Sequence, residues 1–470
     1  MELIDFDLVG LRDLVARGEV SPEEIARAYI DRIEQVEPTI NGFAQFKPDR
    51  ALDQAKSASN DATAGALAGL PYAVKDCLEV EGWITTFGTQ GYSDHVSTYS
   101  ATVAKRLEEA GGILLGITNA PELGASIETD NLLYGRTNNP IDLSRTPGGS
   151  TGGGAALVKA KALPFVVGSD FGGGSRNTAH CCGLFAHRPS LGLVSTAGYL
   201  FGCVGMKGQM CRLAPLARSV RDLELVFSVI GGSDPDDPKT DGVVARTPTD
   251  ERDRLRIAVV ANTEVAPCEF EIEAAITAFG NALSAGHEVE TPDLGKVIAV
   301  GSELAHSLFV ADAGRLMREA LETVAHTETL SPNLQFWLNS MTRLSEQRAG
   351  DFEVLMARWE GYRLAINRLF ETYDFLIWPA GPTIAPKHGE TLDEQFFWHS
   401  IAYTTPVSLT ASPVLVVPIG IGRNDMPITV QIIARSWADE QLLAFGRSLQ
   451  EGDGPVRNLI ELALAVPVQV

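Results

Sequence analysis

Residues 164–176 have the sequence Pro-Phe-Val-Val-Gly-Ser-Asp-Phe-Gly-Gly-Gly-Ser-Arg, a short apolar run that leads into a cluster of glycines. The apolar run is typical of a buried strand. A second glycine-rich segment, residues 147–154, has the sequence Pro-Gly-Gly-Ser-Thr-Gly-Gly-Gly. Glycines allow successive main-chain N–H groups to turn toward one point, where they hold an anion. The two segments therefore predict a site for either a phosphate or an oxyanion.

The sequence around these segments alternates between strand and helix patterns. Residues 69–74 predict a short buried strand that ends at Lys75. A helix is expected to begin at residue 101 and to end at Gly111, and a strand is expected over 113–117. Further strands are expected over 255–260, 375–379, 414–418 and 426–433, and helices over 21–38, 219–230 and 439–449. This alternation predicts the α/β class with a largely buried sheet.

The composition limits the function classes. The chain has 470 residues with 45% hydrophobic and 21% charged residues, which indicates a globular protein. A net charge of −22 disfavours nucleic-acid partners, because such a surface repels phosphate backbones. The acidic start does not resemble a secretion signal, and no long apolar run predicts a membrane span. The 6 cysteines are expected to be buried, inert thiols, so the protein is expected to be soluble and cytoplasmic.

Standard nucleotide-binding motifs do not explain the glycine clusters. A phosphate-binding loop ends in Gly-Lys-Ser/Thr, whereas this chain continues Gly153-Gly154-Ala155, and the dinucleotide fingerprint also fails. Serines and a lysine beside an oxyanion site suggest acyl transfer instead, since a buried neutral lysine can take the proton of a serine. Two structural alternatives stay open at this point: Lys75 as a salt-bridge partner of Asp76, and the glycine loops as simple tight turns.

The motifs resemble those of the amidase signature hydrolases. Residues 147–153 are similar to the family's P-G-G-S-S-G-G, and residues 168–176 to its G-S-D-x-G-G-S-I-R. Residues 71–76 resemble the lysine motif, and residues 118–124 resemble T-N-x-P-E-x-G. Further matches lie at residues 215–220, 374–386 and 427–431, so the resemblance extends over nearly the whole chain. It implies a single amidase-like α/β domain with a central mixed, twisted sheet covered by helices on both faces.

The resemblance also implies site residues for the hydrolysis of carboxylic amides. By position, Lys75 is the general base and Ser150 the relay serine, which is held in a cis peptide. The main-chain N–H groups of Phe171, Gly172 and Gly173, together with that of Gly174, are expected to form the oxyanion hole. The expected partner is a small-molecule amide substrate and a homodimer is possible, while no cofactor, metal, nucleic acid or membrane is expected.

The chain departs from the family at the nucleophile. In ungapped alignment the catalytic serine falls on Gly174, which has no side chain, and the next position is Ser175. In one interpretation Ser175 is a displaced nucleophile. In the other the acyl-enzyme chemistry is lost, or another group such as Ser150 or Cys77 performs it. A further alternative for Ser175 is a structural role, as a cap for the helix expected to begin near Arg176.

The resemblance implies that residues 1–470 form one domain. This domain is expected to contain four regions: a helical region at about 1–60, a signature core at about 65–240, a helical substrate-selecting region at about 265–400, and C-terminal strands and a helix at about 400–470. An amide-bond hydrolase is the leading hypothesis, and an impaired or non-hydrolytic binding or partner protein is the alternative. The amidase component of a tRNA-dependent amidotransferase is less expected, because of the negative charge and Gly174. Five aromatic residues are candidates for an apolar acyl pocket: Trp83, Phe87, Phe201, Trp378 and Trp398.

Overall fold

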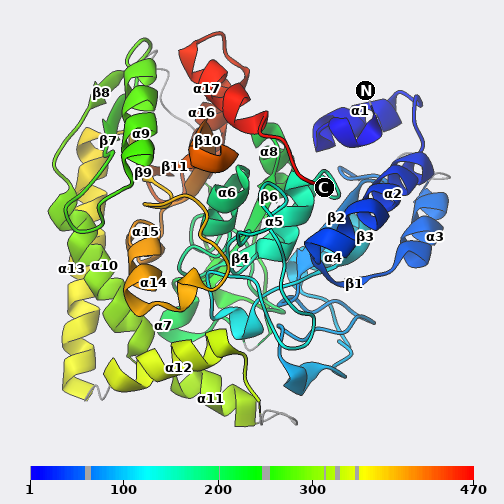
Figure 1. Cartoon of the computed structure of the whole chain (residues 1–470), viewed down its shortest axis with the longest axis horizontal. Helices are drawn as coiled ribbons and strands as arrows, with labels where there is room; N and C mark the ends of the chain where they lie inside the picture. The colour runs from blue at the N-terminus through cyan, green and yellow to red at the C-terminus, as the bar shows by residue number, and fades with distance from the viewer. Residues whose placement is uncertain are drawn as a thin grey trace.

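A single mixed sheet forms the centre of the molecule. The computed structural model describes residues 2–58, 65–200, 202–245, 254–311, 314–322, 329–344 and 349–470. Within these residues the sheet has 11 strands in the order β1-β3-β2-β4-β6-β5-β10-β11-β9-β7-β8 (Figure 1). The strands are β1 (Phe43–Phe46), β2 (Pro71–Lys75), β3 (Ile113–Thr118), β4 (Phe165–Asp170), β5 (Phe185–Arg188), β6 (Arg212–Ala217), β7 (Arg256–Val259), β8 (Glu288–Glu290), β9 (Phe375–Pro379), β10 (Val414–Ile421) and β11 (Pro427–Ala434).

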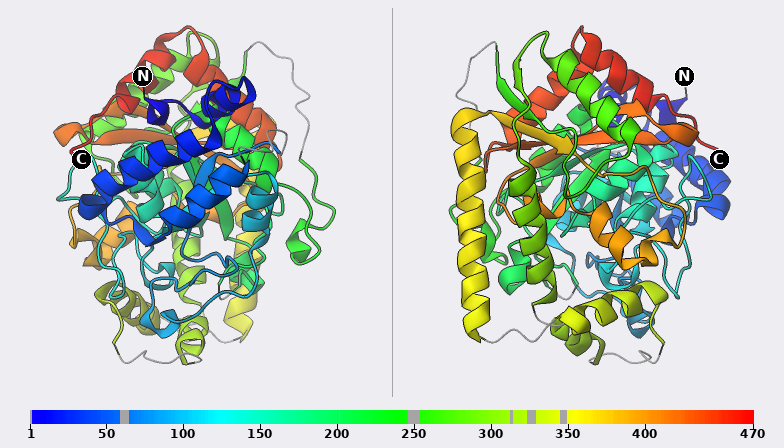
Figure 2. Two further views of the ribbon diagram at one scale, coloured as in Figure 1. Left: turned by 90° about the vertical axis from the view of Figure 1, so that its right-hand side faces the viewer. Right: turned by 60° about the vertical axis from the view of Figure 1, so that its left-hand side comes forward.

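Helices surround this sheet, as Figures 1 and 2 show. They are α1 (Leu8–Ala16), α2 (Pro22–Ile40), α3 (Pro48–Ala58), α4 (Thr102–Glu109), α5 (Gly152–Lys159), α6 (Arg176–Cys182), α7 (Gly205–Gly208), α8 (Val220–Ile230), α9 (Phe270–Leu283), α10 (Gly295–Val310), α11 (Arg315–Glu322), α12 (Pro332–Leu344), α13 (Ala349–Thr372), α14 (Glu394–Ser400), α15 (Thr405–Ser408), α16 (Asp439–Glu451) and α17 (Pro455–Leu464). None of the helices in the described ranges is long and apolar enough to cross a membrane.

Glycines allow helices to approach the sheet closely from both faces. A Cβ on Gly154 of α5 would lie 2.7 Å from a methyl carbon of Val166, and one on Gly446 of α16 would lie 2.1 Å from a methyl carbon of Leu415. The strand register places Val166 on the same face as Val416, so that Leu415 points to the opposite face. Helices α5 and α16 therefore cover opposite faces, which confirms the expected α/β fold.

The order and direction of the strands bring Lys75 and residues 168–170 together. Strand β2 is parallel to β4, with Ala73 opposite Val166 and Val74 opposite Val167. Since the carboxyl ends of parallel strands meet at the same edge, Lys75 at the end of β2 and residues 168–170 at the end of β4 lie side by side. The glycine cluster that follows β4 leads directly into α6, and residues 147–151 lead into α5.

One helix differs from its sequence-based boundary. The pattern predicts that the first long helix ends at Pro38, but α2 continues to Ile40 with Pro38 inside its last turn. Proline removes one donor, yet the main-chain N–H of Asn41 still donates to the Glu37 oxygen at 2.9 Å. Asn41 then adopts a left-handed conformation with a φ of 56°, which ends the helix.

Candidate active site

Lys75 lies between two serine hydroxyls at the carboxyl edge of β2 and β4. Its Nζ is 2.7 Å from the Ser150 Oγ and 2.8 Å from the Ser169 Oγ. The sequence pattern singles out Lys75 and Ser150, and the structure brings these two side chains together. Ser169 belongs to the second glycine-rich motif, but the pattern predicts no role for it. The sequence signal that could have identified Ser169 is its position at the end of β4, the strand that pairs with β2.

The surroundings of Lys75 favour a neutral amine. The side chain is fully buried, and this burial lowers the pKa of Lys75 below its ordinary value. The neighbouring Asp76 accepts hydrogen bonds from the Thr86 side chain and from the main-chain N–H groups of Thr86 and Gly88. No ion pair of Lys75 occurs in the described part of the chain, so the salt-bridge alternative with Asp76 is wrong.

Ser150 is placed where Lys75 and a cavity meet. The peptide bond between Gly149 and Ser150 is cis. Ser150 is only 8% exposed, yet it belongs to the cavity wall together with Gly149 and Gly174. Its hydroxyl is therefore in contact with a buried amine on one side and with a space for a ligand on the other.

Gly174 packs closely against both serines. A Cβ on Gly174 would lie 2.5 Å from the Ser169 main-chain oxygen and 2.9 Å from the Ser150 Oγ. Both distances are shorter than van der Waals contact, so any side chain here requires the loop to move. The glycine therefore leaves no side chain against the Ser150 hydroxyl at this point.

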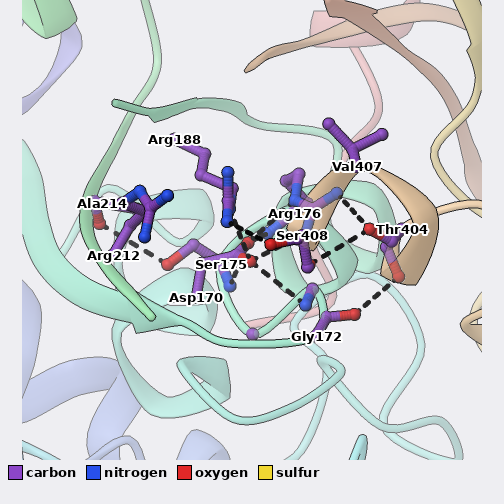
Figure 3. Close-up of polar contacts among 12 residues, drawn as sticks. Asp170, Gly172, Ser175, Arg176, Arg188, Arg212, Ala214, Thr404, Val407 and Ser408 are labelled. Carbon is purple, nitrogen blue, oxygen red and sulfur yellow. Dashed lines mark hydrogen bonds and ion pairs between the residues drawn. The ribbon is translucent and has the colours of Figure 1, made fainter. Parts of the chain in front are cut away.

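The hydroxyl of Ser175 points toward the main-chain oxygen of Ala214, as Figure 3 shows. Its hydroxyl is 3.3 Å from the Ser169 main-chain oxygen, 3.5 Å from the Ala214 oxygen and 3.4 Å from the Thr151 hydroxyl. The side chain is fully buried and does not line the cavity. Among the residues with described positions, Ser150 is not a hydrogen-bond partner of Ser175.

Asp170 is the anion that the second glycine loop encloses. Its carboxylate accepts the main-chain N–H groups of Gly173, Ser175 and Arg176 at 3.1, 3.3 and 3.1 Å. Ser175 is the N-cap of α6, but its hydroxyl makes no capping bond, so the predicted capping role is wrong. Burial would raise the pKa of Asp170, but the Arg176 guanidinium overcomes this effect and lowers it to about 2.

This arrangement divides the expected oxyanion donors into two groups. The Gly173 N–H is already engaged by Asp170. The N–H groups of Phe171, Gly172 and Gly174 have no acceptor among the described residues. All three residues line the cavity beside Ser150. These three main-chain donors are therefore available to an oxygen atom of a ligand.

Three buried arginine side chains lie near the Asp170 carboxylate: Arg176, Arg188 and Arg212. The sequence motifs predict only Arg176. Arg176 donates to Asp170 at 2.8 Å and to the Thr404 oxygen at 2.7 Å, and Arg188 lies 3.4 Å from Asp170 (Figure 3). Arg212 is opposite Asp170 in the strand register and donates to carbonyl oxygens. Arg188 and Arg212 carry no motif signal, because only the pairing of β5, β6 and β10 brings them to this place.

The cavity has a volume of about 300 Å³ and a mainly apolar wall. Of the five predicted aromatic residues, Phe87 lines it. Trp83 and Trp378 are buried elsewhere, Trp398 stacks on His306, and Phe201 lies outside the described residues. The region expected to select substrates, residues 265–400, contributes Phe309, Met317, Trp337, Met341 and Phe397 to the wall.

The two histidines near the site have structural partners. His180 lies 2.9 Å from the Thr429 hydroxyl and 2.8 Å from the Thr383 oxygen. His187 lies 3.1 Å from Asp439 of α16. In the described part of the chain, no group of His, Cys, Asp or Glu side chains is arranged to hold a metal ion.

Comparisons with known proteins identify the family of the chain. The family model named Amidase matches residues 24–443, and the chain belongs to the amidase family. This family defines a class of enzymes that act on amide bonds.

Particular relatives cover almost the whole chain. It is 30% identical to a glutamyl-tRNA(Gln) amidotransferase subunit of Halothermothrix orenii, over 96% of this chain and 98% of that protein. The structure of 6-aminohexanoate cyclic dimer hydrolase aligns with 98% of this chain and 99% of its own, with a TM-score of 0.85 and 26% identity. A structure described as an amidase aligns with 95% of this chain and 99% of its own, with a TM-score of 0.82 and 26% identity.

Proposed function

We propose that the protein hydrolyses carboxylic amides with an apolar acyl or amine group, and that Ser150 is the nucleophile with Lys75 as its general base. The observation that carries this proposal is the 2.7 Å distance between Lys75 Nζ and Ser150 Oγ, at the wall of an apolar cavity. A direct contact of this length allows proton transfer without a relay. Ser175 is a less suitable nucleophile, because its hydroxyl is bonded within the loop.

The proposed reaction begins with a neutral Lys75. The lone pair of its amine accepts the Ser150 hydroxyl proton while the Ser150 oxygen attacks the amide carbon. The negative charge that develops on the amide oxygen is held by the N–H groups of Phe171, Gly172 and Gly174, a contribution worth about 3–4 kcal/mol per donor elsewhere. The Lys75 ammonium then protonates the leaving amine. Water hydrolyses the Ser150 ester, with Lys75 again as the base.

The burial of Lys75 supports its role as the base that takes the proton of Ser150. The described residues offer Lys75 no carboxylate partner within ion-pair distance, and the complete burial of its side chain disfavours the ammonium form. Ser169 occupies a second position around the amine at 2.8 Å, which orients the lone pair toward Ser150. We propose that Ser169 is a positioning residue for this reaction.

A panel of aryl and alkyl amides tests the proposal with the full chain. We expect turnover of amides with apolar substituents, and a loss of activity of about 10²- to 10⁴-fold in Lys75→Met. The exposed Lys105→Met is the matched control and should keep full activity. Absence of turnover across the panel by the unmodified chain, or equal rates in Lys75→Met, would contradict the proposal.

The second candidate is a binding or partner protein without hydrolytic activity, which Gly174 favours. The relatives named as amidotransferase subunits also point to work within an assembly, although a net charge of −22 disfavours contact with tRNA. Under this alternative, amides raise the melting temperature of the chain but are recovered intact. Amide turnover by the isolated chain would exclude it.

A further inference from the structure

Glu128 is a buried carboxylate near the cavity, and its partners all come from one distant segment of the chain. The residue is only 3% exposed. Its Oε1 lies 2.9 Å from the His388 Nδ1, and its Oε2 accepts the Gly389 main-chain N–H at 3.0 Å and the Thr391 hydroxyl at 2.9 Å. Both carboxylate oxygens are therefore bonded to residues 385–391, which we call the strap.

The strap also pairs with the chain that leads into Ser150. The Thr146 main-chain N–H donates to the Pro386 oxygen at 3.1 Å. The His388 main-chain N–H donates to the Ser144 oxygen at 3.3 Å. The paired residues directly precede the glycine loop that carries the Ser150 hydroxyl, so the strap holds the chain at the entry to this loop.

The chain around Glu128 contacts the same glycine loop directly. The Thr129 hydroxyl donates to the Gly148 oxygen at 2.9 Å. A Cβ on Gly149 would lie 2.7 Å from the Glu128 main-chain nitrogen, so the two main chains are in close contact. Gly148 and Gly149 immediately precede Ser150. The loop is thus held both by the strap and by the residues next to Glu128.

The Glu128 side chain joins these two supports. Burial alone would raise its pKa, but the hydrogen bonds from His388, Gly389 and Thr391 outweigh burial and lower the pKa of Glu128 below its ordinary value. The group is therefore an ionised carboxylate at neutral pH. An ionised carboxylate only accepts hydrogen bonds, so the His388 Nδ1 carries the hydrogen in this contact.

We propose that Glu128 is a positioning residue for the reaction at Ser150: its carboxylate fixes the strap against the glycine loop and so holds the Ser150 hydroxyl against Lys75. This inference rests on the function proposed above for Ser150 and Lys75. Glu128 does not line the cavity, so it acts through the loop and not on the substrate. A misplacement of about 1 Å can cost about 10²-fold in rate, so a small shift of the loop is enough.

Asp439 provides a matched control, because its carboxylate has the same three kinds of partner. It is fully buried, lies 3.1 Å from the His187 ring, and accepts the main-chain N–H and the hydroxyl of Ser190. Neither Asp439 nor these partners line the cavity. Neutralising either carboxylate leaves buried donors poorly satisfied, so both changes should reduce stability. Only the change at Glu128 should displace Ser150.

Initial-rate kinetics of the full chain with one apolar amide test the proposal. In Glu128→Gln, kcat should fall by about 10- to 100-fold, while KM should change by less than about threefold. Asp439→Asn should keep both parameters. An unchanged kcat in Glu128→Gln, or an equal fall of kcat in Asp439→Asn, overturns the proposal.

Thr391→Val is a milder variant, which keeps the test possible if Glu128→Gln does not fold. It retains the shape of the side chain and removes one of the three donors to Glu128. We expect kcat to fall in the same direction but less, by about 3- to 10-fold, with little change in KM. An unchanged kcat in this variant counts against the role of the carboxylate.

Hydrogen exchange measured by mass spectrometry tests the hold on the loop without any assay of catalysis. Peptides that cover residues 144–150 and 385–391 should exchange faster in Glu128→Gln than in the unmodified chain, and at the unmodified rate in Asp439→Asn. Unchanged exchange in Glu128→Gln overturns the proposal even if the rate falls. If the unmodified chain hydrolyses no amide, the function proposed above fails, and the exchange rates still decide whether Glu128 holds the loop.

Discussion

The two glycine loops of the site differ in what they retain from the family pattern. The first loop, residues 147–154, keeps Ser150 in direct contact with Lys75. The second loop, residues 168–176, keeps its framework, in which Asp170 accepts three main-chain N–H groups and pairs with Arg176. At position 174, where the resemblance to the family implies the nucleophile, this chain has a glycine. The difference shows that the conformation of the second loop depends on Asp170 and its partners and not on a side chain at position 174.

The largest expected effect on amide turnover comes from a substitution in the first loop. Ser150→Ala removes the proposed nucleophile, so amide turnover should fall by about 10²- to 10⁴-fold. Ser175→Ala, in the second loop, removes a hydroxyl that bonds only within the protein and should change turnover little. Initial rates with one apolar amide measure both. If Ser175→Ala loses the activity and Ser150→Ala keeps it, Ser175 is the nucleophile.

A substitution of Asp170, in the second loop, should cause a large decrease in the free energy of unfolding. Asp170→Asn leaves the buried Arg176 and Arg188 without a carboxylate, so the free energy of unfolding should decrease by about 3–5 kcal/mol. Urea denaturation measures this change. The exposed Asp94→Asn is the control and should shift the free energy of unfolding by less than about 0.5 kcal/mol. Equal stability of the two variants would show that Asp170 does not hold the loop.

A side chain at Gly174 should affect both loops. Gly174→Ala places a Cβ against the Ser169 oxygen and the Ser150 hydroxyl, so it should lower the free energy of unfolding by about 1–3 kcal/mol and reduce turnover. Gly361→Ala is the control, because a Cβ at this helical glycine meets no neighbouring atom. It should leave turnover unchanged. Full activity in Gly174→Ala would indicate that Ser150 does not need the space that Gly174 leaves.

Lys75 gives the site a defined pH dependence. Burial lowers the pKa of Lys75, while Cys77, Cys211, Asp170 and Asp76 oppose this effect when they carry negative charge. The base acts in its neutral form, so the rate should rise with pH through this lowered pKa and level off below the ordinary value of 10.5. The pH profile of initial rates measures this. A rate that falls as pH rises through this range would contradict a neutral Lys75.

Local patterns predict the elements that carry the motifs. The apolar runs before Lys75 and Gly168 are strands β2 and β4, and the pattern that begins at Ser21 is helix α2. The contact of Lys75 with Ser150 also follows from motif resemblance. These features depend on short stretches of chain, whose periodicity and spacing are visible in the sequence.

Contacts between distant elements are not predictable in this way. Arg188 reaches Asp170, and Arg212 lies opposite Asp170 in the strand register, only because β6 pairs with β4 and with β5. The expected capping by Ser175 is wrong, since its hydroxyl lies against the Ser169 and Ala214 main-chain oxygens instead. Which partner a hydroxyl such as that of Ser175 finds depends on the packing of the complete fold and is not visible in the local sequence.

The position of a covalent adduct tests the central claim most directly. A fluorophosphonate reacts with an activated serine, and peptide mass analysis of the labelled chain identifies that serine. The account predicts one adduct on Ser150, absent in Lys75→Met. An adduct on Ser175 or Ser169, or an adduct on Ser150 that forms equally well without Lys75, would contradict it.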